Sequence, residues 1–203
     1  MTLVPKGDTG SSTALSISPA AAPQGGNITI TVNVTEAGSN SKPGGLVTLY
    51  QQKTAVATFP ISGGKASVTT AVPALYPGVY PITAIYSGSG NVYKSESAPV
   101  EFSVLNTTST DVYASRYTVP QGQSVTISAS IGQDTSYYDI IGGTLTFYAD
   151  GQALATVPVT QGSASLTAST SGIPTGTYNV TGKYSGDAYN APSSSPAIQI
   201  TVQ

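Results

Sequence analysis

The feature that most constrains this chain is an internal repeat of a two-residue pattern. Short runs in which apolar and polar residues alternate recur about 98 residues later along the chain. GGLVTLY (residues 44–50) recurs as GGTLTFY (142–148), and PGVYPITAIYSG (77–88) recurs as TGTYNVTGKYSG (175–186). Alternation of period two is typical of a β-strand with one buried and one solvent-exposed face. Because the spacing holds over most of each half, the sequence predicts two similar all-β domains in tandem.

Each half contains about seven such runs, rich in Thr, Val, Ile and Tyr and separated by Gly, Pro, Asn and Ser. No window shows a sustained helical period. About seven short strands per copy predict an immunoglobulin-like β-sandwich, in which the inner faces of two sheets form the core. The expected organisation is a linker resembling the tail of a preceding repeat (1–11), a first domain (12–104), a short linker (105–109) and a second domain (110–203).

A tyrosine near the start of the sixth predicted strand supports the sandwich in each half. Tyr80 and Tyr178 each lie two residues after a glycine. From this position a tyrosine hydroxyl can donate to backbone upstream, which is the tyrosine corner of such sandwiches. The alternative is an ordinary core tyrosine.

The sixth predicted strand of each half ends in a motif that resembles a known family. YSGD (184–187), with GGTLTFYADGQ before it, is similar to the bacterial Ig-like repeats found in tandem in large surface and adhesin-like proteins. The first copy departs from this pattern because Ser89 replaces the aspartate. The resemblance covers about 12–104 and 109–202. It implies an extracellular, cell-surface chain whose neighbours are further Ig-like repeats, but no particular ligand, because this fold serves many functions.

Charge and residue types exclude several classes of function. Only 8% of residues are charged, with seven Lys and Arg in all, and the chain has no Cys and no His. A protein that binds nucleic acids or anionic membrane surfaces needs clustered basic residues. No apolar run approaches the roughly 20 residues of a membrane span. Without His or Cys, serine–histidine and thiol mechanisms are excluded. We therefore expect no enzyme activity, no nucleic-acid partner and no membrane insertion.

Carboxylates offer the remaining chemistry. Asp134 and Asp139 share one polar loop, which supplies neither the burial nor the fixed geometry that a catalytic pair needs. We expect no cofactor, with a calcium ion near Asp111 or Asp187 as the alternative. For Asp187 the competing interpretation is a turn in which the side chain accepts backbone hydrogen bonds. Asp150, followed by glycine, predicts a hairpin turn.

Tyr137 and Tyr138 fit no strand pattern and lie in a loop of the second half. An exposed tyrosine pair can stack on a sugar or anchor a protein partner. The alternative is a loop that packs its own rings.

Three functions fit these observations. The first is a non-catalytic spacer or stalk of a surface protein, which predicts two similar domains without a deep pocket. The second is a glycan- or protein-binding adhesion module that uses loops of the second domain. The third is an Ig-like domain of a phage virion. Because low charge leaves sheet edges lightly protected, we expect a monomer or weak self-association.

Overall fold

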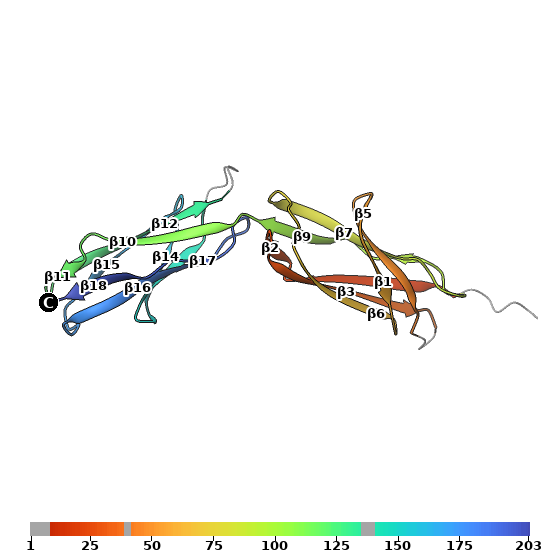
Figure 1. The fold of residues 1–203 in the computed structure, drawn as a ribbon, viewed down its shortest axis with the longest axis horizontal. Helices are drawn as coiled ribbons and strands as arrows, with labels where there is room; N and C mark the ends of the chain where they lie inside the picture. The colour runs from red at the N-terminus through yellow and green to blue at the C-terminus, as the bar shows by residue number, and fades with distance from the viewer. Residues whose placement is uncertain (1–8, 39–41, 135–140) are drawn as a thin grey trace, which may run out of the picture. The chain divides into compact units, whose positions relative to one another are not determined.

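The computed structural model describes residues 9–38, 42–134 and 141–203. The regular secondary structure of these residues consists of β-strands, and none of the described residues lies in a helix. The chain divides into two compact units between Val104 and Leu105, and each unit holds two sheets (Figure 1). The predicted all-β class, with two sandwiches in tandem, is confirmed. Within the described ranges no helix is long and apolar enough to span a membrane.

The first domain is built from a three-stranded and a six-stranded sheet. The smaller sheet has, in spatial order, β1 (Ser11–Ser18), β3 (Asn27–Glu36) and β6 (Lys65–Ala71). The larger sheet has β2 (Ala21–Pro23), β9 (Val100–Leu105), β7 (Gly78–Tyr86), β4 (Gly45–Gln51) and β5 (Thr54–Ile61), with β8 (Ser95–Glu96) paired to β7.

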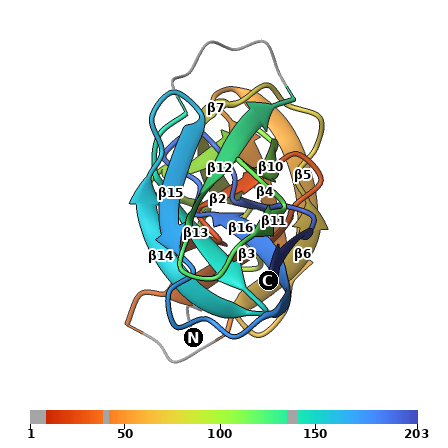
Figure 2. The same cartoon turned by 90° about the vertical axis from the view of Figure 1, so that its left-hand side faces the viewer.

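The second domain repeats this topology strand for strand. Its smaller sheet has β10 (Thr108–Ala114), β12 (Ser124–Gln133) and β15 (Ser163–Ser169). Its larger sheet has β11 (Thr118–Val119), β18 (Ile198–Val202), β16 (Gly176–Tyr184), β13 (Thr144–Ala149) and β14 (Gln152–Pro158), with β17 (Ser193–Ser194) paired to β16. Figure 2 views this domain from the end that carries the C-terminus.

The predicted linker 105–109 is mostly part of the strands. Leu105 is the last residue of β9, and Thr108 is the first residue of β10. Between them Asn106 is buried, and its N–H donates to the Tyr189 carbonyl at 2.8 Å while its own carbonyl accepts from the Ala191 N–H. Backbone pairing therefore begins before the predicted domain start. In the first domain the corresponding pairing begins at residue 9, ahead of β1 and inside the predicted linker 1–11.

The inward-facing residues predicted from the two-residue period form the cores. In β12 all four are at most 4% exposed: Val125, Ile127, Ala129 and Ile131. In β3 Val32 and Val34 are buried, but Ile30 is partly exposed. The buried residues of the second domain form one continuous cluster, whereas those of the first domain form two. The first domain is therefore less completely filled between its sheets.

The outer faces of the sheets carry pairs of hydroxyl side chains on neighbouring strands. Their oxygen–oxygen distances lie between 2.7 and 3.2 Å, and the pairs are Thr29–Thr69, Thr31–Ser67, Thr48–Thr58, Thr126–Thr167, Thr146–Thr156 and Thr177–Thr201. Cross-strand contacts of this kind each stabilise a sheet modestly. In this chain they occupy positions where other proteins often place charged pairs.

The two ends of the second domain lie at opposite ends of strand β16. The Thr108 hydroxyl donates to Ser193 Oγ at 2.8 Å, and Ser193 pairs with Tyr184, the last residue of β16. Val202 pairs with Gly176, the first residue of the same strand. At about 3.3 Å per residue, these two ends of β16 are roughly 27 Å apart.

The first domain has the same arrangement on β7. The Ser11 hydroxyl donates to Ser95 Oγ at 2.6 Å, and Ser95 pairs with Tyr86 at the end of β7. Val104 pairs with Gly78 at the beginning of this strand. In each domain the chain therefore enters at one end of the sandwich and leaves at the other.

Candidate functional site

The loop after β16 is organised around the carboxylate of Asp187. Its Oδ1 accepts from the backbone N–H groups of Tyr189 and Asn190, both at 2.9 Å. Its Oδ2 accepts from the Gly142 N–H at 2.9 Å and from the Tyr184 hydroxyl at 3.1 Å. The Asn190 side-chain amide contacts both oxygens, at 2.9 and 3.0 Å. The carboxylate thus ties the end of β16 to the segment that leads into β13.

These contacts determine the protonation states of Asp187 and Tyr184. Burial by itself would raise the pKa of the Asp187 carboxyl, but the hydrogen bonds from Asn190, Tyr189, Gly142 and Tyr184 outweigh it and hold the pKa below its ordinary value. The pKa of Tyr184 is raised, first by burial and then by its hydrogen bond to the negative carboxylate. Asp187 therefore stays ionised and Tyr184 stays protonated across neutral pH.

The first domain builds the corresponding loop without a carboxylate. Ser89 stands in place of the aspartate, and the Tyr86 hydroxyl donates instead to the backbone carbonyl of Gly44 at 2.7 Å. Burial raises the pKa of Tyr86, against an opposing contact from Ser89. In the second domain Asp187 accepts backbone N–H bonds from its own loop, as expected of a turn-forming residue, one of the two interpretations that the sequence left open.

The two aspartates predicted as possible calcium ligands have different surroundings. Both oxygens of Asp187 accept hydrogen bonds from protein donors, so a cation there would have to displace them. Asp111 lies exposed in β10. Within residues 9–38, 42–134 and 141–203, no group of three or more acidic side chains is arranged to hold a metal ion. Calcium binding stays a prediction that this arrangement does not favour.

The tyrosines near the start of the sixth strand make the same hydrogen bond in both domains. The Tyr80 hydroxyl donates to the Tyr76 carbonyl at 2.7 Å, and the Tyr178 hydroxyl donates to the Pro174 carbonyl at 2.8 Å. Each bond joins the strand to backbone four residues upstream, as expected of a tyrosine corner. These side chains therefore have a structural task. Tyr137 and Tyr138, predicted as a recognition pair, lie outside the described residues.

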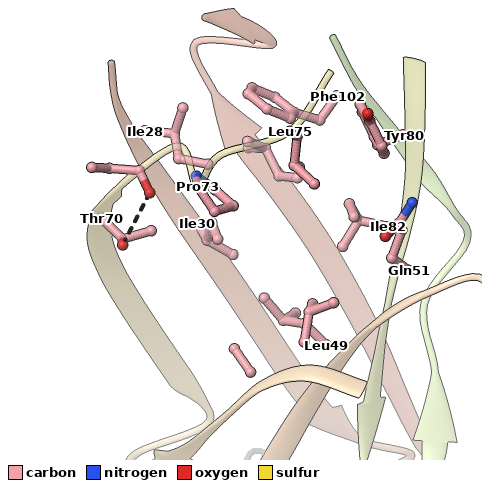
Figure 3. Close-up of a pocket in the computed structure, with 14 residues that line it drawn as sticks. Ile28, Ile30, Leu49, Gln51, Thr70, Pro73, Leu75, Tyr80, Ile82 and Phe102 are labelled. Atoms are coloured by element: carbon pink, nitrogen blue, oxygen red, sulfur yellow. Dashed lines mark hydrogen bonds between the residues drawn. The ribbon is translucent and has the colours of Figure 1, made fainter. Parts of the chain in front are cut away.

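The first domain has a cavity that sequence reasoning missed. It lies between the two sheets and has a volume of about 350 Å³ (Figure 3). Figure 3 shows the side chains pointing toward one another across this space. The smaller sheet and the chain after β6 supply Ile17, Ile28, Ile30, Thr70, Ala71, Pro73 and Leu75, and the larger sheet supplies Leu49, Gln51, Val56, Ala57, Tyr80, Ile82 and Phe102.

The spacer hypothesis had predicted domains without a deep pocket, and the first domain departs from that expectation. Two differences between the copies could have indicated the cavity. Leu49 corresponds to Phe147, and Gln51 corresponds to Ala149. A smaller apolar residue and a polar one replace two residues that fill the second core.

Comparisons with known proteins agree with this fold. Among solved structures, the fibronectin(III)-like modules of Clostridium thermocellum CbhA match with a TM-score of 0.55 and 16% identity, covering 94% of this chain and 92% of that one. The FN1–FN3 domains of chicken CNTN1 match with a TM-score of 0.50 and 13% identity, covering 97% of this chain and 69% of that one. At these identities the likeness shows the fold alone. No curated protein sequence matches the chain.

A family model supplies the assignment that structural likeness cannot. The model described as "Bacterial Ig-like domain (group 3)" matches residues 15–105 and again 112–203. The two matches cover most of the chain and fall one in each structural unit. They agree with the resemblance carried by the sixth-strand motif. The chain therefore belongs to the bacterial Ig-like domain family, with one copy of the domain in each half.

Proposed function

We propose that this chain is a non-catalytic spacer segment of an extracellular bacterial surface protein, in which its domains stand in series with other Ig-like domains. The observation that carries the proposal is the position of the ends of each domain. Ser11 and Val104 lie at opposite ends of β7, and Thr108 and Val202 lie at opposite ends of β16. Within each domain the chain therefore runs the length of the sandwich between its entry and its exit, as a spacer requires.

The polar groups of the two domains also support a structural role. Among the described residues every buried side-chain nitrogen and oxygen has a hydrogen-bond partner. The most constrained carboxylate, that of Asp187, is surrounded by donors that hold it in a turn. A catalytic acid or base must instead face a substrate and exchange a proton with it. These polar side chains therefore form hydrogen bonds within the protein, as a structural role requires.

The second domain is arranged to resist force applied through its ends. β11 lies parallel to β18, with Val119 paired to Val202. Three backbone bonds join the two segments: Thr201 N–H to Tyr117 O at 2.8 Å, Gln203 N–H to Val119 O at 3.0 Å and Gln121 N–H to Gln203 O at 2.7 Å. Because the chain enters and leaves at opposite ends, tension would shear these bonds together instead of breaking them one after another.

Single-molecule pulling tests the proposal. Held by its two termini, the chain should unfold in two events, each releasing roughly 300 Å of contour length for about 98 residues. A control holds the second domain by Gln203 and by a Ser171→Cys handle, in the loop at the same end as Gly176. This geometry peels β18 away from its neighbours, so unfolding should need several-fold less force. Equal forces in the two geometries would contradict the role of a spacer under tension.

The adhesion-module and phage-virion alternatives remain predictions. Binding of glycan or protein rests on Tyr137 and Tyr138, which lie outside the described residues. Weak self-association through sheet edges also remains a prediction, and sedimentation that shows a monomer up to high concentration would contradict it.

A further inference from the structure

The two copies of the domain differ in how their cores are filled. Inward-facing positions that are buried in the second domain are partly exposed in the first. Ile127 is 2% exposed, whereas its counterpart Ile30 is partly exposed, and Val180 is 2% exposed, whereas its counterpart Ile82 is partly exposed. The first domain keeps large apolar residues at these positions although they border a cavity of about 350 Å³. Apolar side chains that line the cavity and contact the core are therefore accessible to solvent.

One substitution contributes to the open space, and another adds a polar group to its wall. Phe147 is fully buried in the second core, and Leu49 stands in its place in the first. Thr70 lines the cavity from β6 at the position that corresponds to Ala168. The cavity is lined in part by β5 and β6, the edge strands of the two sheets, so it lies along this edge of the sandwich.

One polar side chain of the lining has no hydrogen-bond partner among the described residues. Gln51 lies at the end of β4 and faces the cavity (Figure 3), and its side-chain amide makes no hydrogen bond within the described part of the chain. The corresponding residue of the second domain is Ala149, which packs against the core. A side-chain amide can both donate and accept hydrogen bonds. It therefore offers one polar contact at the border of an otherwise apolar space.

We propose that the first domain binds a small, uncharged, mainly hydrocarbon molecule between its two sheets, with one polar group of that molecule on the Gln51 amide. The cavity lies at the lower end of the range typical of ligand pockets, about 300–1,000 Å³. A cavity of about 150 Å³ can hold benzene, so this one accommodates a molecule roughly twice that size. The lining has no charged side chain, and an ion would lose its hydration there without compensation.

The test uses the full chain, labelled with carbon-13 at its isoleucine methyl groups, and titrated with 1-naphthol. This probe is neutral and bicyclic and has one hydroxyl. The methyl signals of Ile28, Ile30 and Ile82 should shift with a dissociation constant of roughly 10–100 µM, as expected of small apolar ligands. The methyl signals of Ile127 and Ile131 in the second domain are the internal control and should stay in place.

Variants that copy the second domain make the test specific. Leu49→Phe should place an aromatic ring in the space that the probe occupies and weaken 1-naphthol binding at least tenfold. Gln51→Ala should weaken 1-naphthol binding about 2- to 10-fold, the effect of one hydrogen bond, and leave the binding of naphthalene unchanged. If Leu49→Phe does not fold, Thr70→Phe, at an exposed position of an edge strand, blocks the same space.

Three results would overturn the proposal. The first is no shift of the three methyl signals at the solubility limit of the probe. The second is a shift of equal size in the methyl signals of the second domain, or a shift that neither Leu49→Phe nor Thr70→Phe changes. The third is a shift that appears on concentrating the protein without any probe, because the cavity would then receive a second copy of the chain.

Discussion

Replacing Asp187 with alanine should destabilise the second domain by about 3 kcal/mol. The change removes the acceptor of three backbone N–H groups, of the Tyr184 hydroxyl and of the Asn190 side chain. A hydrogen bond to a charged group contributes roughly 1.5–3 kcal/mol, and donors left buried without a partner cost more than donors that water can reach. Asp187 is partly exposed, so water replaces part of the loss, and the total corresponds to about two such bonds.

The assay is scanning calorimetry of the full chain. For a domain of this size, about 3 kcal/mol lowers the melting temperature by roughly 12–24 °C. The matched control is Asp111→Ala, which removes an exposed carboxylate from β10 and should change stability by less than about 0.5 kcal/mol. The transition of the first domain should stay in place in both variants. A shift of similar size in the two variants would refute the assignment, because it would trace to net charge rather than to the Asp187 contacts.

The contribution of Asp187 should also depend on pH. Hydrogen bonds hold its pKa in the folded domain below the unfolded value of about 3.9. Its stabilising contribution is therefore fully present above that value and is lost as the pH falls through the folded pKa. In Asp187→Asn the second domain should lose less stability between pH 5 and pH 2 than the natural sequence does. A steeper loss in the variant would contradict the direction of the shift.

Two further predictions follow from the packing of the second domain, and a third tests the proposed tyrosine pair. Gly143→Ala should cost at least about 2 kcal/mol more than Gly151→Ala, measured by urea denaturation, because a Cβ at the first site meets backbone and at the second meets open space, while both have positive φ. Phe147→Leu should lower the stability of the domain by about 1–2 kcal/mol, and an unchanged melting temperature would show that the ring does not fill the core. Glycan-array binding, if present, should be lost in the double variant Tyr137→Ala with Tyr138→Ala; binding that survives it would exclude this pair as the recognition site.

The architecture was predictable because alternation determines which face of a strand is buried. The pattern of β12 predicted the burial of Val125, Ile127 and Ala129. Asp150, as predicted, lies in a tight hairpin turn with positive φ, followed by a glycine with positive φ. These features depend on residues that are close together in the sequence, so a single sequence is enough to predict them.

The cavity and the Asp187 contacts depend on residues that are distant in sequence. Alternation shows that Leu49 faces inward but not that the opposite sheet leaves space beside it. Similarly, the turn at Asp187 was an open alternative, but its bond to Gly142 joins residues 45 positions apart. The buried pairing of Asn106 could not be predicted for a related reason, because it depends on the chain near Tyr189.

The hydroxyl pairs on the outer faces give these domains an unusual independence from their medium. Attraction between exposed charges weakens as salt is added and changes sign or disappears as groups titrate. A threonine hydroxyl bonded to another across two strands, as in Thr48 with Thr58, carries no charge to screen and no proton to lose near neutral pH. The stability of the sheets should therefore change little with salt concentration or at mildly acidic pH, as the proposed extracellular spacer would require.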